Sequence, residues 1–365
     1  MKTIKYLTLL FGAAILLTAC GGSGSTGPAD RLLSDLQASV DRGAILFGQQ
    51  DAYMYGHTWK ASDINSLDRT DVGDVCGMHP AVLGLDLGGI ELGSEHNLDG
   101  NSFDFMRRAA LGHYAQGGIL TFSWHPRNPL TGGDSWDVSS DKAVASVLEG
   151  GEKHELFMGW LSLCADYLET FRDADGNLVP MIFRPWHEHT GSWFWWGQNL
   201  CTTEEYLALW KMTYDYMTLE RHLGNIVWAY SPGAGPDSTG YMERYPGDRM
   251  VDILGLDCYQ YGELPASNAS YAAQLKDALF FMTELGQRHG KLIALTETGV
   301  EGLPYPQWWT EVFYPAIKGY PIAYVLVWRN AWDKPGHFYA PWPGQESAED
   351  FRALVKSGGV RMLQQ

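Results

Sequence analysis

The sequence predicts a single (β/α)8 barrel over residues 30–365, and three observations support this fold class. Short apolar runs rich in β-forming residues alternate with amphipathic helical stretches, which is typical of βαβ units and a parallel sheet. Eight such runs occur, and no Pro-rich linker or change in composition divides the chain after residue 30. The runs end in polar or aromatic residues, as expected where barrel strands open onto their loops.

Each strand is expected where about four to eight apolar residues lie between turn residues. In chain order these runs are 44–47, 81–87, 119–124, 179–185, 226–230, 251–257, 292–296 and 322–328. Helices are expected where apolar residues recur every third or fourth position, at 105–116, 153–172, 203–223, 271–289 and 307–317. Strands and helices in this order predict a closed barrel that occupies the whole domain.

The composition narrows the class of protein and of partner. Of 365 residues, 45% are hydrophobic and 19% are charged, so the chain can bury a core and is not disordered as a whole. The net charge of −17 repels polyanions, which disfavours nucleic acid and polyanionic polysaccharides as partners. Fifteen Trp, 19 Tyr and 14 Phe supply more flat aromatic surface than core filling usually needs. These rings favour a neutral ligand with C–H faces.

Residues 1–19 are expected to be a signal peptide, because two lysines precede an apolar run that is too short to span a bilayer. The step Leu17-Thr18-Ala19-Cys20 resembles the lipobox of bacterial lipoproteins, in which the cysteine is acylated. Cys20 would then be the lipidation site, and residues 20–29 would form a Gly/Ser-rich tether. The alternative is a plain secretory signal in which Cys20 is incidental. The expected location is the cell envelope, anchored on the periplasmic side of the outer membrane rather than at the cell surface.

Four cysteines remain in the domain, Cys76, Cys164, Cys201 and Cys258, and they are widely spaced with no CxxC pair. This spacing disfavours a zinc site. One or two disulfides in an oxidising compartment and four buried thiols are both compatible with it, and the pairing cannot be deduced. No HExxH or EF-hand pattern occurs, so we expect neither a metal nor a cofactor.

The residues that close the strands carry the functional prediction, because the chemistry of a parallel barrel gathers there. They are Asp86, Trp124 with His125, His187 with Glu188, Asp257 to Tyr259, Glu297, and Trp328 with Arg329. Polar residues also mark strand exits into water, but packing alone does not explain so many polar strand ends. We therefore expect these side chains to meet at the mouth of the barrel.

Side-chain alternation along a strand decides which of these residues face the barrel axis. Glu188 comes two positions after Trp186 and is expected to share its face, with His187 on the other face. Glu297 is expected to share a face with Leu295 in the same way. If both of these faces are the barrel interior, the two glutamates point toward the axis.

Glu188 and Glu297 close the fourth and seventh strands, which lie across the barrel from each other. Their carboxyl groups would then approach within the roughly 5 to 5.5 Å of a retaining glycosidase. One would stay ionised as the nucleophile, and the surroundings of the other would keep it protonated as the acid. Asp257 and Tyr259 share a parity, so the Tyr259 hydroxyl is expected beside Glu297. Arg184 is expected to be an ion-pair partner in the barrel interior.

Four consecutive aromatic residues, 193–196, follow shortly after Glu188. A loop at a barrel rim has little interior to fill, so we expect these rings at the surface rather than in a core. Pyranose rings stack their C–H faces on such planes, and their hydroxyl edges need polar partners. The segment therefore predicts carbohydrate binding.

Four segments together resemble glycoside hydrolase family 26. They are RPWHE at 184–188, GSWFWWG at 191–197, TETG at 296–299 and VWRN at 327–330. The resemblance covers roughly residues 118–332 and is weaker before the second strand. The best-known members of this family are endo-β-1,4-mannanases, so the resemblance implies an enzyme that degrades mannan, galactomannan or glucomannan.

By this resemblance, Glu188 is the general acid/base and Glu297 is the nucleophile of a double displacement with retention. The implied substrate is a neutral β-mannan, and no cofactor takes part. The resemblance also implies seven residues that bind substrate or orient the nucleophile: His125 and His187 in subsite −1, Tyr259 with Asp257 beside the nucleophile, Trp328 as the stacking platform of subsite −1, Arg329 at subsite −2, and Trp193 on the +1 side.

Three alternatives to an endo-mannanase stay open. They are an exo-acting mannanase that releases mannobiose, a mixed-linkage β-glucanase or β-1,3-xylanase of the same family, and a non-catalytic glycan-binding lipoprotein. The last would be expected to lack a carboxylate, and here both are present. Endo or exo action and tolerance of galactose side groups depend on loop shape. We expect a monomer that contacts the membrane only through its lipid anchor.

Overall fold

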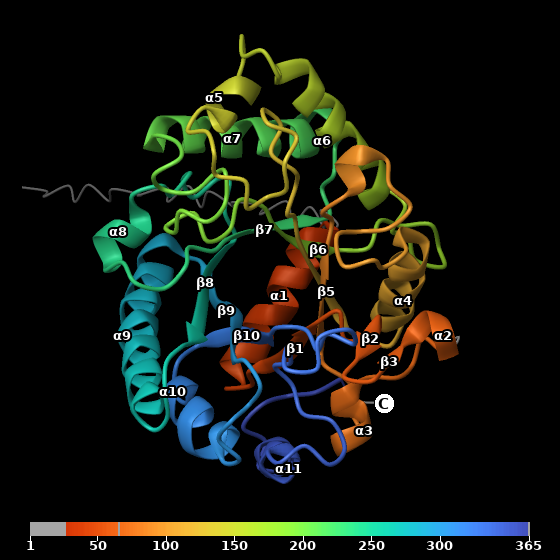
Figure 1. Cartoon of the computed structure of the whole chain (residues 1–365), viewed down its shortest axis with the longest axis vertical. Helices are drawn as coiled ribbons and strands as arrows, with labels where there is room; N and C mark the ends of the chain where they lie inside the picture. Colours follow the sequence, from red (N-terminus) through yellow and green to blue (C-terminus); the bar gives the residue numbers. More distant parts are fainter. Residues whose placement is uncertain (1–26, 65, 364–365) are drawn as a thin grey trace, which may run out of the picture.

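The computed structural model describes residues 27–64 and 66–363. Eight parallel strands close into one barrel in the order β1-β10-β9-β8-β7-β6-β5-β4 (Figure 1). They are β1 (Leu46–Gln50), β4 (Val82–Asp86), β5 (Ile119–Ser123), β6 (Met181–Arg184), β7 (Ile226–Tyr230), β8 (Ile253–Gln260), β9 (Leu292–Val300) and β10 (Ile322–Val327). The predicted (β/α)8 barrel is confirmed, and each predicted strand overlaps one of these strands.

Helices surround the barrel, and a small antiparallel pair, β2 (Tyr55–Gly56) and β3 (Trp59–Lys60), follows β1. The α-helices are α1 (Pro28–Asp41), α2 (Ala61–Ile64), α3 (Asp71–Cys76), α4 (Phe103–Ala115), α5 (Ala143–Val147), α6 (His154–Leu168), α7 (Thr203–Asp215), α8 (Ser238–Met242), α9 (Ala266–His289), α10 (Tyr314–Ile317) and α11 (Ala348–Lys356). A 3-10 turn spans Ile90–Leu92, and π-helical turns span Tyr216–Glu220 and Trp308–Phe313. The helices predicted at 203–223 and 307–317 therefore each contain a π-helical segment.

Local sequence signals set the ends of the two helices that flank the later strands. Thr202 forms a capping box before α7: its hydroxyl accepts a hydrogen bond from Glu205 N at 3.2 Å, and the Glu205 carboxylate accepts one from Thr202 N at 2.8 Å. Helix α9 ends at Gly290, whose φ of 63° lies in the left-handed region that glycine adopts easily. The capping box fixes where α7 begins, and Gly290 fixes where the chain turns from α9 into β9.

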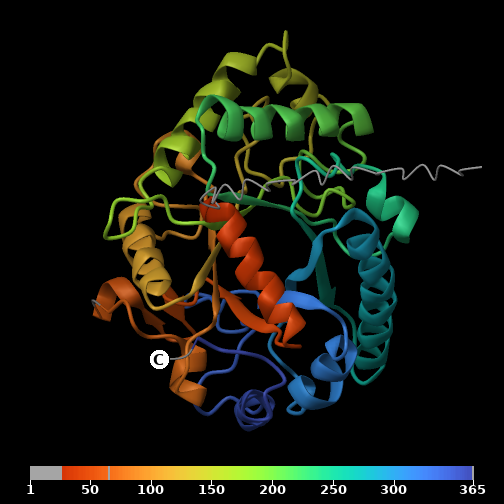
Figure 2. The ribbon, with the colours of Figure 1, turned by 180° about the vertical axis from the view of Figure 1, so that it is seen from behind.

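Helix α1 closes the N-terminal end of the barrel, and Figure 2 shows it lying across that end. Leu32 and Leu36 are four positions apart on one helical face and pack into the base of the barrel. Pro28 occupies the first turn, where its missing N–H costs nothing. The tether predicted at 20–29 is therefore too long by two residues, which belong to this helix, and residues 20–26 lie outside the described part.

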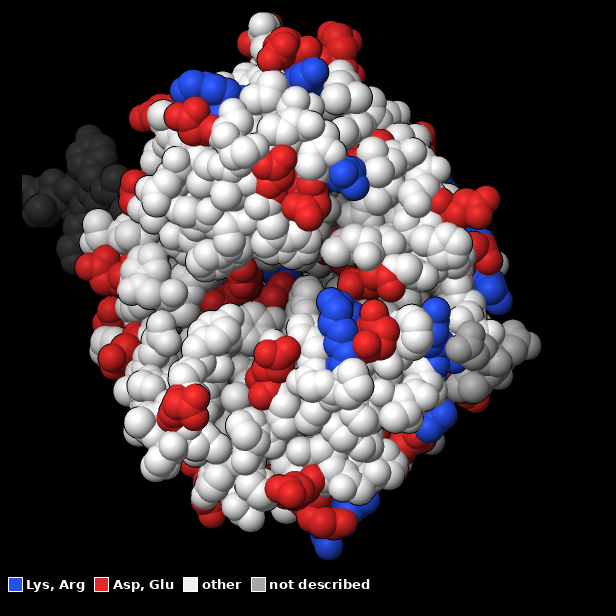
Figure 3. Space-filling view, in the orientation of Figure 1, with Lys and Arg blue, Asp and Glu red and all other residues white. Residues whose placement is uncertain are grey.

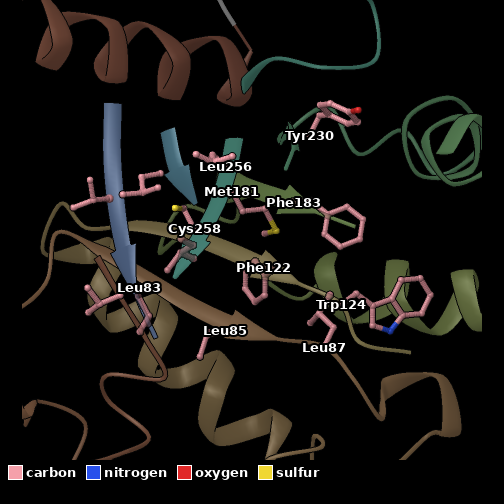
Figure 4. Packing of buried hydrophobic residues seen from close by; sticks show 14 of the residues in the cluster. Leu83, Leu85, Leu87, Phe122, Trp124, Met181, Phe183, Tyr230, Leu256 and Cys258 are labelled. Carbon is pink, nitrogen blue, oxygen red and sulfur yellow. The ribbon is translucent and has the colours of Figure 1, made fainter. Parts of the chain in front are cut away.

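Side chains at alternate strand positions form two apolar clusters. One fills the barrel interior above α1, and its strand members include Val82, Ile182, Val227, Ala229, Ile253, Ala294, Tyr324 and Leu326. The other lies between the strands and the surrounding helices, and Figure 4 shows part of it, including Leu83, Leu85, Phe122, Phe183, Leu256 and Cys258. On β8 this alternation places Asp257 and Tyr259 together on the side of the axis.

The four cysteines of the domain are free thiols in the structure. Cys164, Cys201 and Cys258 are buried, and Cys76 is half-buried. Of the two alternatives that the spacing leaves open, the structure therefore has thiols rather than disulfides.

The predicted signal peptide, 1–19, and the predicted lipidation site, Cys20, lie outside the described residues. Within the described part of the chain, no helix combines the length and the apolar character needed to cross a bilayer. The lipid anchor stays a prediction.

Candidate active site

Glu297 faces the barrel interior because strand β9 contains a β-bulge. Leu295 pairs with Leu256 of β8, but the next pair is Glu297 with Asp257, so Thr296 is an extra residue. Leu295 packs in the outer cluster, and the bulge turns Glu297 toward the axis. The expectation that Glu297 and Leu295 share a face is therefore wrong, although Glu297 does point inward.

Glu188 lies on an irregular turn beyond the end of β6. The strand stops at Arg184, and both Trp186 and Glu188 have left-handed φ values, 53° and 52°. Trp186 is buried in an aromatic cluster outside the barrel, whereas Glu188 N donates a hydrogen bond to Ser231 O at 2.8 Å. Strand alternation does not apply to such a turn, so the faces predicted for Trp186, His187 and Glu188 are wrong. Left-handed backbone is costly for residues other than glycine and concentrates at functional sites.

The two glutamates meet at one place in the mouth of the barrel. One oxygen from each of the carboxylates of Glu188, Asp257 and Glu297 lies within 4.8 Å of the other two. This proximity fits the roughly 5 to 5.5 Å between the carboxyl groups of a retaining glycosidase. An inverting enzyme needs about 6.5 to 9.5 Å, because a water molecule must fit between the carboxylate and the sugar.

Both oxygens of Glu297 accept hydrogen bonds. Arg184 Nη2 donates to Oε1, and the Tyr259 hydroxyl donates to Oε2 at 2.7 Å. Charge-assisted hydrogen bonds of this kind stabilise the carboxylate and fix its plane. The hydroxyl predicted beside Glu297 is therefore present, and Glu297 is oriented as a nucleophile requires.

Glu188 has different surroundings. The indole Nε1 of Trp193 donates a hydrogen bond to Glu188 Oε2 at 2.7 Å. Burial, and after it the nearby charge of Glu297, raises the pKa of Glu188 to about 7. A large fraction of Glu188 therefore keeps its proton at neutral pH, as a general acid must.

Arg184 joins Glu297 to a second buried acid, Asp257. Its Nη1 donates to Asp257 Oδ2 at 2.8 Å and to Ser231 Oγ at 3.1 Å. Asp257 also accepts a hydrogen bond from Thr296 Oγ1 at 2.7 Å, and its side chain is 0% exposed. Arg184 is thus the interior ion-pair partner that the sequence predicts. Asp257, predicted among the substrate-binding residues, lies behind Glu297 and compensates the charge of Arg184 without facing the cleft.

His125 and His187 contact each other near the glutamates. Their Nε2 atoms lie 3.0 Å apart, and His125 Nδ1 lies 2.6 Å from Asp86 Oδ2. Burial, and then the charge of Arg184, lowers the pKa of His187 well below its usual value, so this ring is neutral. His187 is fully buried and reaches the site through His125.

Only one of the four aromatic residues at 193–196 is exposed, namely Trp193 at 47%. The other three rings are buried: Phe194, Trp195 and Trp196. Trp195 Nε1 donates to Pro126 O at 3.1 Å, which ties this segment to the loop after β5. The long loops after β5 and β6 build a core of their own, so the prediction of exposed rings is wrong for three of the four.

Exposed aromatic rings border the mouth of the barrel. Trp136 is stacked on His125 with ring centres 5.4 Å apart, and the partly exposed Trp328 lies 6.5 Å from the same ring. Trp193 reaches the site through its hydrogen bond to Glu188. Figure 3 shows this face of the molecule hollowed at its centre, with acidic side chains on the floor of the hollow. The arrangement combines flat apolar surfaces with buried acids, as a carbohydrate site does.

Arg329 lies where the loops after β1, β4 and β10 meet. Its Nη2 forms an ion pair with Asp99 at 3.0 Å, and its Nη1 donates to the Tyr55 hydroxyl at 3.2 Å. Asp71 joins the segment after β1 to the loop after β10 by accepting hydrogen bonds from Trp59 Nε1 and Asn330 Nδ2, each at 2.7 Å. Arg329 is therefore held in place and keeps 12% of its side chain exposed.

Asp86 has no role in the prediction from the sequence, although its position at the end of a strand is a usable signal. Ser231 and Thr296 have no predicted role either. Their contacts with Arg184 and Asp257 depend on the β9 bulge and on the spacing of neighbouring strands. No local pattern in the sequence indicates these contacts.

Comparisons with known proteins agree with this geometry. The sequence model of glycosyl hydrolase family 26 matches residues 26–314. The chain is 30% identical to a mannan endo-1,4-β-mannosidase of Bifidobacterium adolescentis over 98% of its own length, and it spans 38% of that protein. It is also 30% identical to a mannan endo-1,4-β-mannosidase of Bacillus subtilis strain 168, with 70% of this chain and 68% of that protein covered.

Solved structures give the same result. A family 26 β-mannanase from Bacteroides ovatus superposes with a TM-score of 0.88 and 47% identity, covering 93% of this chain and 95% of the other. The catalytic domain of an endo-β-1,4-mannanase from Bacillus sp. JAMB-750 superposes with a TM-score of 0.84 and 31% identity, covering 93% and 92%. The family match reaches further toward the N-terminus than the predicted resemblance and ends at residue 314, before Trp328 and Arg329. Because this match covers most of its length, the chain belongs to glycosyl hydrolase family 26.

Proposed function

We propose that the chain is a retaining endo-β-1,4-mannanase. The proposal rests on one observation, a pair of carboxylates at one site with opposite surroundings. Glu297 is bonded by Arg184 and Tyr259, whereas Glu188 has a pKa raised to about 7. Double displacement needs this division between an ionised nucleophile and a protonated acid.

In the first step, Glu188 donates its proton to the glycosidic oxygen as the bond from that oxygen to the anomeric carbon breaks. A carboxylate oxygen of Glu297 forms a bond to the same carbon, and the leaving part of the chain departs as an alcohol. In the second step, the Glu188 carboxylate takes a proton from water while the water oxygen displaces Glu297. Glu188 is again protonated, Glu297 is again an anion, and two inversions give net retention.

The names of the relatives support mannan as the substrate, since both curated relatives are mannan endo-1,4-β-mannosidases. The exposed ring of Trp193 would stack on the sugar at the +1 side, and Trp328 would do so at subsite −1. Arg329 would contact the sugar at subsite −2, because 12% of its side chain stays exposed. A neutral polysaccharide also suits a chain with a net charge of −17.

Removal of the nucleophile tests the mechanism. Glu297→Ala should abolish hydrolysis, and added azide should restore turnover of an activated mannoside and give a glycosyl azide of inverted configuration. Glu188→Ala with azide should instead give the azide of retained configuration, because azide then attacks the glycosyl-enzyme. Glu284→Ala, an exposed glutamate on α9, is the matched control and should keep wild-type turnover. Near-native hydrolysis of mannan by Glu297→Ala would reject the assignment.

Product profiles test the substrate and the mode of attack. Time courses on unbranched mannan and on a galactomannan should give mixed oligosaccharides early, as internal cleavage requires. Mannobiose as the sole early product would favour the exo-acting alternative. Strong hydrolysis of lichenan or β-1,3-xylan with none of mannan would assign the other β-glycans. Binding to any of these glycans without release of reducing sugar would favour the non-catalytic alternative.

We also propose that the chain is a lipoprotein anchored through Cys20, active as a monomer on the periplasmic side of the outer membrane. The support is the lipobox-like step that ends at Cys20. Mass spectrometry of the membrane fraction should find an acylated Cys20 at the N-terminus, and Cys20→Ala should release a soluble enzyme. Protection of the anchored enzyme from protease added to intact cells would support the periplasmic side, and sedimentation of the soluble form would test the monomer.

A further inference from the structure

A buried chain of hydrogen bonds runs from the end of β4 to the turn after β6. Asp86 Oδ2 accepts a hydrogen bond from Ser123 Oγ at 2.6 Å and lies 2.6 Å from His125 Nδ1. Asp86 Oδ1 accepts a hydrogen bond from Gly88 N at 2.7 Å. At the other end, His125 Nε2 lies 3.0 Å from His187 Nε2. Asp86 is 1% exposed, so it cannot touch substrate, and the double displacement assigns it no step.

These contacts determine which atoms carry hydrogen. Burial would raise the pKa of Asp86, but the His125 ring and the hydroxyl and amide donors outweigh burial and lower it. An ionised carboxylate only accepts, so His125 Nδ1 carries a hydrogen. Burial would lower the pKa of His125, but Asp86 outweighs burial and raises it above its usual value. His125 Nε2 then also carries a hydrogen, and it donates a hydrogen bond to Nε2 of the neutral His187.

Charged and titratable groups face His125 from every element packed around it. They are Asp86 on β4, Asp99 on the following loop, Arg184 on β6, His187 and Glu188 on the turn after β6, and Glu297 on β9. Carboxylates predominate in this set, and Arg184 is the one permanent cation in it. A positive charge on His125 is therefore stabilised by its surroundings and stabilises the ionised forms of the two glutamates in return.

We propose that Asp86 is a positioning residue that acts through His125, orienting the imidazole and keeping a positive charge beside the carboxylate pair. The catalytic part of this inference rests on the proposed glycosidase function. In that mechanism Glu188 must give up its proton in one step and take a proton in the next. A cation nearby keeps the pKa of Glu188 from rising further, so that both transfers proceed near neutral pH.

Asp86→Asn tests the proposal, because it keeps the shape of the side chain and removes its charge. We expect kcat to fall about tenfold or more while KM changes by less than about threefold. The alkaline limb of the kcat/KM profile should move to higher pH, because Glu188 loses a neighbouring cation and holds its proton more tightly. Asp104→Asn, an exposed aspartate on α4, is the matched control and should leave both kcat and the profile unchanged.

Two further variants separate action through His125 from a general loss of structure. Ser123→Ala removes one hydrogen bond to Asp86 and leaves its charge, so its kcat should fall less and its alkaline limb should stay in place. The double variant Asp86→Asn/His125→Gln should be no slower than His125→Gln alone. Additive losses in the double variant, or an unshifted profile in Asp86→Asn, would overturn the proposal.

Nitrogen-15 chemical shifts of the His125 ring test the same inference without activity. In the full wild-type chain, with His125→Gln used for assignment, both ring nitrogens should be protonated at about pH 6, and Asp86→Asn should reverse this. A neutral His125 ring in the wild-type chain would reject the proposal even if Asp86→Asn does not fold. A protonated His125 in a chain that hydrolyses no β-glycan would instead reject the proposed function alone.

Discussion

The ends of β6 and β9 each supply one of the two glutamates, but their backbones differ. Glu297 lies within a nine-residue strand, where a bulge turns it inward, and Arg184 and Tyr259 hold both of its oxygens. Glu188 lies beyond the end of a four-residue strand, on a left-handed turn, and Trp193 from the same segment is its side-chain donor. A rigid, charged site suits a nucleophile, whereas a group that gains and loses a proton can lie on an irregular turn. The backbone thus already separates the two roles.

Arg184→Met should have the largest effect, and it acts on the surroundings of Glu297 on β9. It removes the cation shared by Glu297 and Asp257 and leaves two buried carboxylates without compensation. We expect the free energy of unfolding to fall by about 3 to 5 kcal/mol, measured by urea denaturation at neutral pH. The loss should shrink at acid pH, because protonation removes the uncompensated charges. Arg221→Met breaks two more exposed ion pairs, with Asp166 and Glu169, and should cost less than about 1 kcal/mol. Equal losses in the two variants would contradict the comparison.

Tyr259→Phe removes a single hydrogen bond from the nucleophile. We expect kcat to fall about 100-fold, equivalent to about 2.7 kcal/mol, with little change in unfolding free energy. Steady-state kinetics on a soluble mannan would measure the fall. Tyr261→Phe, two residues further along and largely exposed, should behave as the wild type. A loss of less than about threefold in Tyr259→Phe would mean that Arg184 alone orients Glu297.

Gly255→Ala tests the packing that supports the bulge. An added Cβ would lie 2.7 Å from side-chain atoms of Thr296 and 2.9 Å from Ser231 Cβ. We expect a cost of about 1 to 3 kcal/mol in unfolding free energy, together with a several-fold lower kcat because Asp257 loses alignment with Thr296. Gly159→Ala, on an open face of α6, should leave activity unchanged and keep or slightly raise stability. A Gly255→Ala variant as stable and active as the wild type would show that the bulge tolerates displacement.

Trp193→Phe should have the smallest effect and acts on the β6 side. In the wild type, kcat/KM should fall as pH rises through about 7, because Glu188 loses the proton that it must donate. Loss of the indole N–H destabilises the carboxylate and raises the pKa of Glu188. The alkaline limb of the kcat/KM profile should therefore move to higher pH by a fraction of a unit. Trp136→Phe changes a rim tryptophan without a hydrogen bond to Glu188 and should leave the limb in place. A shift to lower pH in Trp193→Phe would contradict the assigned donor.

The parts of this molecule that follow from periodicity were predictable from the sequence. Alternation of apolar runs gave all eight strands, and the polar strand ends gave Glu188 and Glu297 as a pair. Side-chain direction at those ends was not predictable, because the extra residue Thr296 and the left-handed turn at Trp186 depend on how neighbouring strands and loops pack.

The predicted exposure of the aromatic residues after β6 was also wrong, and the cause is the length of the loops. Trp195 and its aromatic neighbours are core residues because the loops after β5 and β6 are long enough to enclose them. A rule drawn from short barrel loops therefore places them wrongly at the surface. Helix α1 was missed for a related reason, since its short apolar stripe is recognisable only once the open base of a barrel is present to receive it.

The position of helix α1 also determines on which side of the barrel a fused partner would lie. The described chain begins at this helix on the closed base, and near its other end Arg361 pairs with Leu46 at the start of β1, and Leu363 pairs with His79 just before β4. Both ends therefore emerge on the side opposite the cleft. A partner fused directly before α1 or directly after Leu363 would therefore lie on the side away from the substrate, which leaves the opening free for a long polymer.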